Sequence, residues 1–173
     1  DPARIGVWGA SAGGHLAALL GTTAKDRRFD VGENLDQSSA VRCVIDSFGP
    51  SDFLHWGDPP IPAAYDTLNT PLARLLGGRL ADHEELARQA SPVTFVDKDA
   101  APFLIMHGEK DPVVPVQQSV VLDAALRRAG VESTLVIVPG AGHGGGVFSD
   151  VRYLYQMAAF MDRHLRGSAG SRR

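Results

Sequence analysis

One short segment near the N-terminus constrains the fold of this chain more than any other. Arg4–Trp8 is a run of β-branched and aromatic residues that predicts a strand, and Ala12–Thr22 is rich in small residues and leucine, which predicts a helix. Between them, Gly9–Gly13 reads Gly-Ala-Ser-Ala-Gly, a G-x-S-x-G pattern. So tight a passage from strand to helix presents the hydroxyl of Ser11 clear of the sheet. We expect glycine to be required on both sides of this serine, and Gly14 to allow close packing of the helix on the strand.

The rest of the chain alternates between strand-like and helix-like segments. Three further apolar runs have the length of buried strands: Val41–Ile45, Phe103–Met106 and Thr134–Val138. Helical patterns mark four segments, with Asp82 as the expected N-cap of the second: Leu72–Leu76, Asp82–Ala90, Val116–Ala129 and Val151–Leu165. This alternation predicts an α/β fold with a mostly parallel sheet and flanking helices.

Prolines separate an irregular stretch from this scaffold. Residues 49–72 contain five of the eleven prolines of the chain. We therefore expect residues 53–90 to form an excursion that covers a pocket, with Phe53, Trp56 and Tyr65 as apolar contacts. Residues 1–166 have the size of one domain, and the polar tail 167–173 is expected to be disordered.

Composition excludes several classes of partner. The 17 basic and 20 acidic residues give a net charge of −3, and no basic cluster precedes the last two arginines, so nucleic acid is not an expected ligand. No apolar stretch approaches the ~18 residues of a membrane span. The single cysteine, Cys43, stands in an apolar run and is expected to be a buried, inert thiol. No zinc-binding motif is present, so neither a metal nor a cofactor is expected. Localisation and oligomeric state stay open.

Two residues at the ends of later strands complete a catalytic constellation with Ser11. A serine hydroxyl is a weak nucleophile that needs a base within hydrogen-bond reach and a carboxylate to orient that base. His143 is the candidate base, because it is the functional side chain of the glycine-dense loop 140–146. Asp111 follows the third strand and is the candidate acid. In a parallel sheet, residues that follow strands meet at one edge.

Other polar residues compete for these roles. Asp46 and Asp52 follow the second strand, and we interpret each as a turn or capping carboxylate. His107 closes the third strand and is expected to brace the acid loop. His15 lies one turn into the first helix and is expected to have a structural role, facing the sheet or a neighbouring helix.

Four motifs in the chain resemble those of microbial α/β-hydrolases. They are RIGVWGASAGGHLA at 4–17, FGPSDF at 48–53, HGEKDPVVP at 107–115 and GAGHG at 140–144. The closest resemblance is to the esterase and lipase branch, which includes feruloyl- and acetyl-esterase-like enzymes and borders the prolyl-oligopeptidase-type peptidases. It implies that Ser11 is the nucleophile, Asp111 the acid, His143 the base and the Ala12 N–H an oxyanion donor. It also implies a small-molecule ester as substrate, with short-chain esters first, acetylated or feruloylated sugars next and peptides third.

The chain departs from this family in one respect. Family members carry further strands and a His-Gly-Gly type loop before the nucleophile, and residues 1–173 contain neither. The chain therefore corresponds to the C-terminal half of the fold, with Arg4–Trp8 as a bare edge. Because the loss of one oxyanion donor typically costs ~10²–10³ in turnover, we expect these residues alone to be inactive or nearly so.

Two readings outside the enzyme class remain. The glycine-rich turn between strand and helix also occurs in nucleotide-binding α/β proteins. In that reading, however, Ser11 occupies a position that requires glycine, and Asp111 and His143 have no function. The second alternative is a truncated or non-catalytic relative that keeps this half of the fold as a structural unit.

Overall fold

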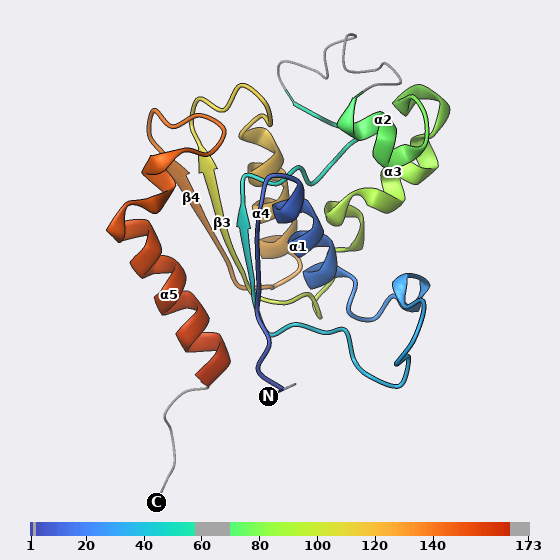
Figure 1. The fold of residues 1–173 in the computed structure, drawn as a ribbon, viewed down its shortest axis with the longest axis horizontal. Helices are drawn as coiled ribbons and strands as arrows, with labels where there is room; N and C mark the ends of the chain where they lie inside the picture. The colour runs from blue at the N-terminus through green and yellow to red at the C-terminus, as the bar shows by residue number, and fades with distance from the viewer. Residues whose placement is uncertain (2, 58–69, 167–173) are drawn as a thin grey trace, which may run out of the picture.

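A computed structural model describes residues 1, 3–57 and 70–166, and in this part of the chain four strands form one parallel sheet (Figure 1). The strands lie side by side in chain order: β1 (Val7–Ala10), β2 (Val44–Ser47), β3 (Phe103–Gly108) and β4 (Ser133–Val138). All three neighbouring pairs are parallel. The prediction of an α/β fold with a parallel sheet is confirmed. β1 forms one edge, where Trp8 is 60% exposed.

Helices cover both faces of the sheet. In Figure 1, α1 (Ala12–Thr22) and α4 (Gln117–Arg128) lie on one side, and α5 (Val151–Arg166) lies on the other. The alternating side chains of β3 divide between the two layers. Phe103 and Ile105 join the cluster with α1 and α4, whereas their neighbours on the strand join the cluster with α5. A parallel strand buried on both faces explains why this segment reads as an unbroken apolar run.

A smaller cluster stands beside the main core. It joins α2 (Pro71–Leu76) and α3 (Glu84–Ala90) to Phe53, and these elements lie beyond the carboxyl ends of the strands (Figure 1). Thr70 caps the start of α2, and its hydroxyl accepts a hydrogen bond from the N–H of Ala73 at 3.1 Å. The described residues also contain short 3₁₀ turns at Arg27–Phe29, Leu80–Asp82, Pro92–Phe95 and Gly146–Ser149.

Several predicted boundaries need correction. β1 begins at Val7 rather than Arg4, because the Asp1 carboxylate accepts hydrogen bonds from the Ala3 N–H and the Arg4 side chain and holds a turn there. β2 is likewise displaced from the predicted Val41–Ile45 to Val44–Ser47. The predicted disordered tail at 167–173 lies outside the described residues.

The prediction that Asp82 caps a helix is also wrong. Asp82 ends the 3₁₀ turn Leu80–Asp82, and its carboxylate forms an ion pair with Arg79 at 2.9 Å. α3 instead starts at Glu84. His83 occupies its N-cap position, and the His83 side chain makes no capping hydrogen bond.

The predictions about Cys43 and about membrane spans can be compared with the structure. Cys43 is buried as predicted, beside Met161 of α5, and burial raises the pKa of its thiol. No helix within the described ranges is long and apolar enough to cross a membrane.

Candidate active site

Ser11 stands on the sharp turn between β1 and α1. Its backbone has φ 56° and ψ −121°, a left-handed conformation that is uncommon for any residue other than glycine. The Ser11 N–H donates to the carbonyl of Ser47 at 2.8 Å, so the sheet ladder continues right up to the turn. Ala12 then opens α1, where the first N–H groups have no intrahelical acceptor.

The glycines around this turn have different functions. A Cβ added at Gly9 would lie 2.0 Å from the carbonyl oxygen of Gly13, so no side chain fits there. At Gly14 a Cβ would lie 2.3 Å from a carboxylate oxygen of Asp46, which explains the close packing predicted for this position. A Cβ on Gly13 would meet no atom within 4 Å. The expectation that glycine is required on both sides of the serine is therefore wrong for Gly13.

The three candidate catalytic side chains form one hydrogen-bonded series. Ser11 Oγ lies 2.8 Å from His143 Nε2, and His143 Nδ1 lies 2.7 Å from Asp111 Oδ2. These residues are 132 and 32 positions apart in the chain, and the loops after β1, β3 and β4 bring them to one edge of the sheet. The side chain of Asp111 is completely buried, whereas that of His143 is 20% exposed.

The carboxylate of Asp111 is held from several directions. Its Oδ1 accepts hydrogen bonds from the N–H groups of Val113 at 2.8 Å and Val114 at 2.9 Å. The Nε2 of His107 lies 3.3 Å from Oδ2 and donates to the Val114 carbonyl at 2.9 Å. Ser119 of α4 donates its hydroxyl to His107 Nδ1 at 2.6 Å, and burial lowers the pKa of this histidine. These contacts agree with the prediction that His107 braces the acid loop.

The loop that carries His143 packs closely against its surroundings. A Cβ at Gly108, the last residue of β3, would lie 2.3 Å from the carbonyl oxygen of Gly142, so the acid and base loops approach backbone to backbone. The ring of Phe48 meets the imidazole edge-on, with centroids 4.9 Å apart. Phe48 also contacts Phe148 and has a left-handed φ of 47°. A residue held in a sparsely populated conformation against the imidazole restricts its position.

Neither rival carboxylate contacts His143. Asp46 is completely buried, and its Oδ1 accepts from the Gly49 N–H at 2.9 Å, while Oδ2 has no partner among the described residues. Burial raises the pKa of Asp46 to about 7. Asp52 holds a turn, accepting from the N–H groups of Leu54 and His55 at 3.0 Å. Both fit the expected role of turn carboxylates.

His15 is buried at the side of the site. Its Nε2 lies 2.7 Å from the carbonyl oxygen of Ala90, at the end of α3, and its ring meets that of Phe53 with centroids 5.1 Å apart. Burial lowers the pKa of His15, which favours the neutral ring. The predicted structural role agrees with these contacts, which are made to a neighbouring helix.

An apolar pocket of about 480 Å³ opens beside Ser11. Phe53 and Trp56 line it as predicted, whereas Tyr65 lies outside the described residues. Leu72, Arg74 and Leu75 of α2 also line it, and they belong to the segment 53–90 that was expected to cover a pocket. The sequence did not point to Leu16 of α1 or to Val113 and Val114 of the acid loop, because their contributions depend on how distant segments pack.

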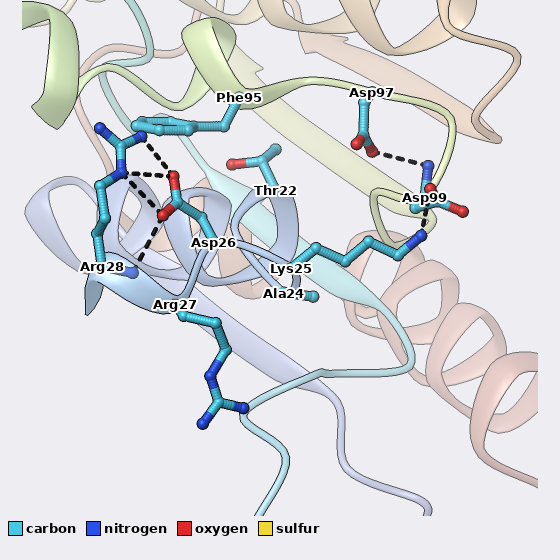
Figure 2. Close-up of a pocket in the computed structure, with 9 residues that line it drawn as sticks. All are labelled: Thr22, Ala24, Lys25, Asp26, Arg27, Arg28, Phe95, Asp97 and Asp99. Atoms are coloured by element: carbon cyan, nitrogen blue, oxygen red, sulfur yellow. Dashed lines mark hydrogen bonds and ion pairs between the residues drawn. The ribbon is translucent and has the colours of Figure 1, made fainter. Parts of the chain in front are cut away.

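A second hollow, of about 360 Å³, lies beyond the other end of α1 (Figure 2). Four of its charged groups form ion pairs with one another, since Lys25 binds Asp99 at 2.5 Å and Arg28 binds Asp26 at 2.5 Å. Helix α1 has 11 residues and separates this hollow from Ser11 by about 16 Å. No group of three potential metal ligands occurs in the described part of the chain.

A parallel sheet covered by helices, with a serine, an aspartate and a histidine in the loops at one edge, is the architecture of an α/β-hydrolase. The family model described as BD-FAE matches residues 1–126, and the chain belongs to this family. This membership favours a hydrolase over the nucleotide-binding protein weighed from the glycine-rich turn.

Similar proteins support the same class. Esterase LipC of Mycobacterium tuberculosis is 35% identical over 150 residues, which are 86% of this chain and 36% of LipC. A truncated carbohydrate esterase from gut microbiota superposes with a TM-score of 0.85 at 36% identity, over 96% of this chain and 61% of that one. A puromycin-hydrolysing peptidase of M. tuberculosis gives a TM-score of 0.69 at 27% identity, over 95% of this chain and 22% of the peptidase. The chain thus spans about a third of the length of its curated esterase relative.

Proposed function

We propose that this protein is a serine carboxylic-ester hydrolase that acts through an acyl-enzyme. The observation that carries the proposal is the hydrogen-bonded series of Ser11, His143 and Asp111 beside an apolar pocket. Membership of the BD-FAE family and the similarity to esterase LipC support the same activity.

In the first half of the reaction, Ser11 Oγ attacks the ester carbonyl carbon while His143 Nε2 takes the hydroxyl proton. Asp111 orients the imidazole through Nδ1 and stabilises the imidazolium that forms. The N–H of Ala12 at the start of α1 donates to the developing oxyanion. When the tetrahedral intermediate collapses, His143 returns the proton to the leaving alkoxide, and the acyl group stays on Ser11.

Water completes the cycle. His143 Nε2 removes a proton from a water molecule as the water oxygen attacks the acyl carbon. The second intermediate releases the carboxylic acid, and the proton on the imidazole returns to Ser11 Oγ. The side chain of His143 is 20% exposed, so water can contact the imidazole ring.

The pocket limits the class of substrate. Its lining is predominantly apolar, which favours short-chain acyl esters, and the similarity to a carbohydrate esterase adds esters carried on sugars. In this proposal residues 1–166 act as one hydrolase domain, and residues 53–90 supply the pocket wall through Phe53, Trp56 and α2.

The test is ester hydrolysis by the protein as its gene encodes it. With p-nitrophenyl acetate as substrate, Ser11→Ala and His143→Ala should each lower kcat by ~10³-fold or more. Asp162→Asn, which changes an exposed carboxylate of α5, serves as the control and should keep most of the activity. Full activity in Ser11→Ala would disprove the assignment, and a folded protein that hydrolyses no ester would fit the non-catalytic alternative.

A serine peptidase is the second candidate, favoured by the similarity to the puromycin-hydrolysing peptidase. Both activities share the acyl-enzyme route and differ in the leaving group, an alkoxide or an amine. Matched ester and anilide substrates with the same acyl group separate them. We expect the ratio of kcat/KM for the ester to kcat/KM for the anilide to exceed the ratio of their uncatalysed hydrolysis rates.

A further inference from the structure

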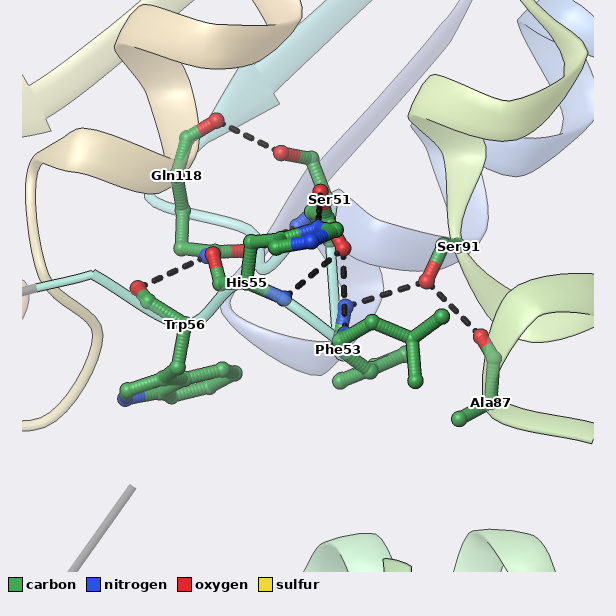
Figure 3. Close-up of polar contacts among 9 residues, drawn as sticks. Ser51, Phe53, His55, Trp56, Ala87, Ser91 and Gln118 are labelled. Atoms are coloured by element: carbon green, nitrogen blue, oxygen red, sulfur yellow. Dashed lines mark hydrogen bonds and ion pairs between the residues drawn. The ribbon is translucent and has the colours of Figure 1, made fainter. Parts of the chain in front are cut away.

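Gln118 is a fully buried polar residue on the apolar side of α4, and its side-chain amide binds a loop rather than its own helix. Its Oε1 accepts hydrogen bonds from the N–H groups of Ser51 at 2.8 Å and Asp52 at 2.7 Å. Its Nε2 donates to the carbonyls of His55 at 3.0 Å and Trp56 at 2.8 Å (Figure 3). A glutamine side chain has two donor hydrogens and two acceptor sites, so every one of them is used.

Two serine side chains add further hydrogen bonds to the loop 51–56. The Ser51 hydroxyl donates to the backbone carbonyl of Gln118 at 2.5 Å. Toward α3, Ser91 Oγ accepts from the Phe53 N–H at 3.0 Å and donates to the Ala87 carbonyl at 2.7 Å (Figure 3). The loop 51–56 has no helix or strand of its own, so these side chains satisfy backbone groups that would otherwise be buried without partners.

This loop forms one wall of the pocket beside Ser11. Phe53 and Trp56 both line the pocket, and their rings stack with centroids 6.2 Å apart and an interplanar angle of 13°. Gln118 itself does not line the pocket. It reaches the wall only through the backbone that carries the two aromatic residues.

We propose that Gln118 is a positioning residue that fixes the aromatic wall of the pocket and thereby sets the size of the apolar ester group that Ser11 accepts. The proposal rests on the function proposed above. Gln118 contacts none of the three side chains of the catalytic series, so its replacement should change the selection of substrates more than the reaction at Ser11.

Two replacements of Gln118 differ in how many contacts they remove. Gln118→Glu keeps an acceptor for Ser51 and Asp52 but places a second oxygen against the carbonyls of His55 and Trp56. Gln118→Met has a similar length and removes all four hydrogen bonds. Both replacements should therefore loosen the loop wherever the variants fold. Gln117 is the matched control, because it neighbours Gln118 on α4 and is exposed to solvent.

The experiment compares kcat/KM across two series of esters, one with lengthening acids and one with lengthening alcohols. In the series for which the unmodified protein prefers the larger group, Gln118→Glu and Gln118→Met should lower the ratio of larger to smallest substrate about tenfold, mainly through KM. The kcat for the smallest substrate, and the rate at which a small phosphonate labels Ser11, should stay within about threefold. Gln117→Glu and Gln117→Met should leave the ratio unchanged.

The outcomes separate the two proposals. Unchanged ratios in both series for folded Gln118 variants would overturn the role of Gln118 while leaving the esterase proposal intact. A protein that neither hydrolyses esters nor takes the label would overturn the esterase proposal instead. In that case the fluorescence of Trp56, with every other tryptophan of the protein replaced by phenylalanine, still reports the wall: acrylamide quenching should rise in Gln118→Glu and Gln118→Met but not in the Gln117 variants, and equal quenching would refute the positioning role.

Discussion

Asp46 and Asp111 lie near the carboxyl ends of neighbouring strands, and both side chains are completely buried, but their surroundings differ. Asp111 accepts two backbone hydrogen bonds on Oδ1 and faces the imidazoles of His143 and His107 with Oδ2. Asp46 accepts one, from Gly49, and its second oxygen has no partner in the described part of the chain. Burial, only partly offset by the hydrogen bond from Gly49, raises the pKa of Asp46 to about 7.

This contrast shows what makes a buried carboxylate useful. The donors around Asp111 compensate for the loss of water and fix the direction in which the carboxylate meets His143. Asp46 instead fills space beside Gly14 and holds the turn that leads to Phe48. Asp46 lies within the last two residues of β2 and Asp111 follows β3, so both are near the carboxyl ends of parallel strands, and the number of donors separates the catalytic candidate from the structural one.

The largest expected effect is on catalysis. Asp111→Asn should lower kcat by ~10⁴-fold, because an asparagine cannot hold His143 in the tautomer that accepts the serine proton. Asp46→Asn should stay within about tenfold of the unmodified protein, because it lies outside the hydrogen-bonded series. Steady-state hydrolysis of one ester by both variants measures the difference. Equal losses would remove the distinction between the two residues.

The pH dependence of stability gives the next effect. Asp46 has a folded-state pKa of about 7 against an ordinary value of 3.8, so the folded protein holds this proton more tightly than the unfolded chain. Its contribution is fully present below pH 3.8 and is lost as the pH rises to about 7. Asp46→Asn removes this loss. Urea unfolding from pH 4 to 8 should show the variant gaining up to about 4 kcal/mol relative to the unmodified protein. A constant difference would contradict the raised pKa.

A smaller effect is expected behind Asp111. Ser119→Ala removes the hydroxyl that donates to His107 Nδ1 and leaves a buried acceptor without its partner. The loss should cost about 1–3 kcal/mol of unfolding free energy. His107 contacts Asp111 but is not one of the three residues of the catalytic series, so kcat should fall by no more than about tenfold. Thermal unfolding together with ester kinetics tests this, and a loss as large as that of Asp111→Asn would place Ser119 in the reaction itself.

The smallest effect belongs to the charges at the far end of α1. Lys25 and Asp99 form an exposed ion pair in the hollow of Figure 2. Water and salt screen such a pair, so Lys25→Met should change neither the melting temperature nor kcat/KM measurably. A clear loss of activity would mean that this hollow takes part in function.

The fold and the sharp turn at Ser11 could be predicted from local sequence patterns, because neighbouring residues specify a strand, a tight turn and a helix. The start of β3 at Phe103 follows directly from an apolar run, and the whole of α1 follows from a segment rich in small residues and leucine. The displaced start of β1 depends on the side chain of Asp1, which no strand pattern includes.

Nonlocal contacts account for what the sequence left open. Asp46 and Asp111 both lie near the carboxyl ends of strands, and the donors that distinguish them come from folded loops and from His143, 32 residues beyond Asp111. Gln118 was missed, although a signal existed. It stands four residues before Leu122 and eight before Leu126, so it interrupts an otherwise apolar helical stripe.

The central claim is that His143 and Asp111 activate Ser11 as a nucleophile, and covalent labelling tests it most directly. The protein as its gene encodes it is treated with a serine-directed phosphonate, and the modified peptide is identified by mass spectrometry. We expect one adduct, on Ser11, that disappears in Ser11→Ala and forms at least ~10²-fold more slowly in His143→Ala. An adduct on another residue, or labelling of Ser11 at an equal rate without His143, would contradict the account.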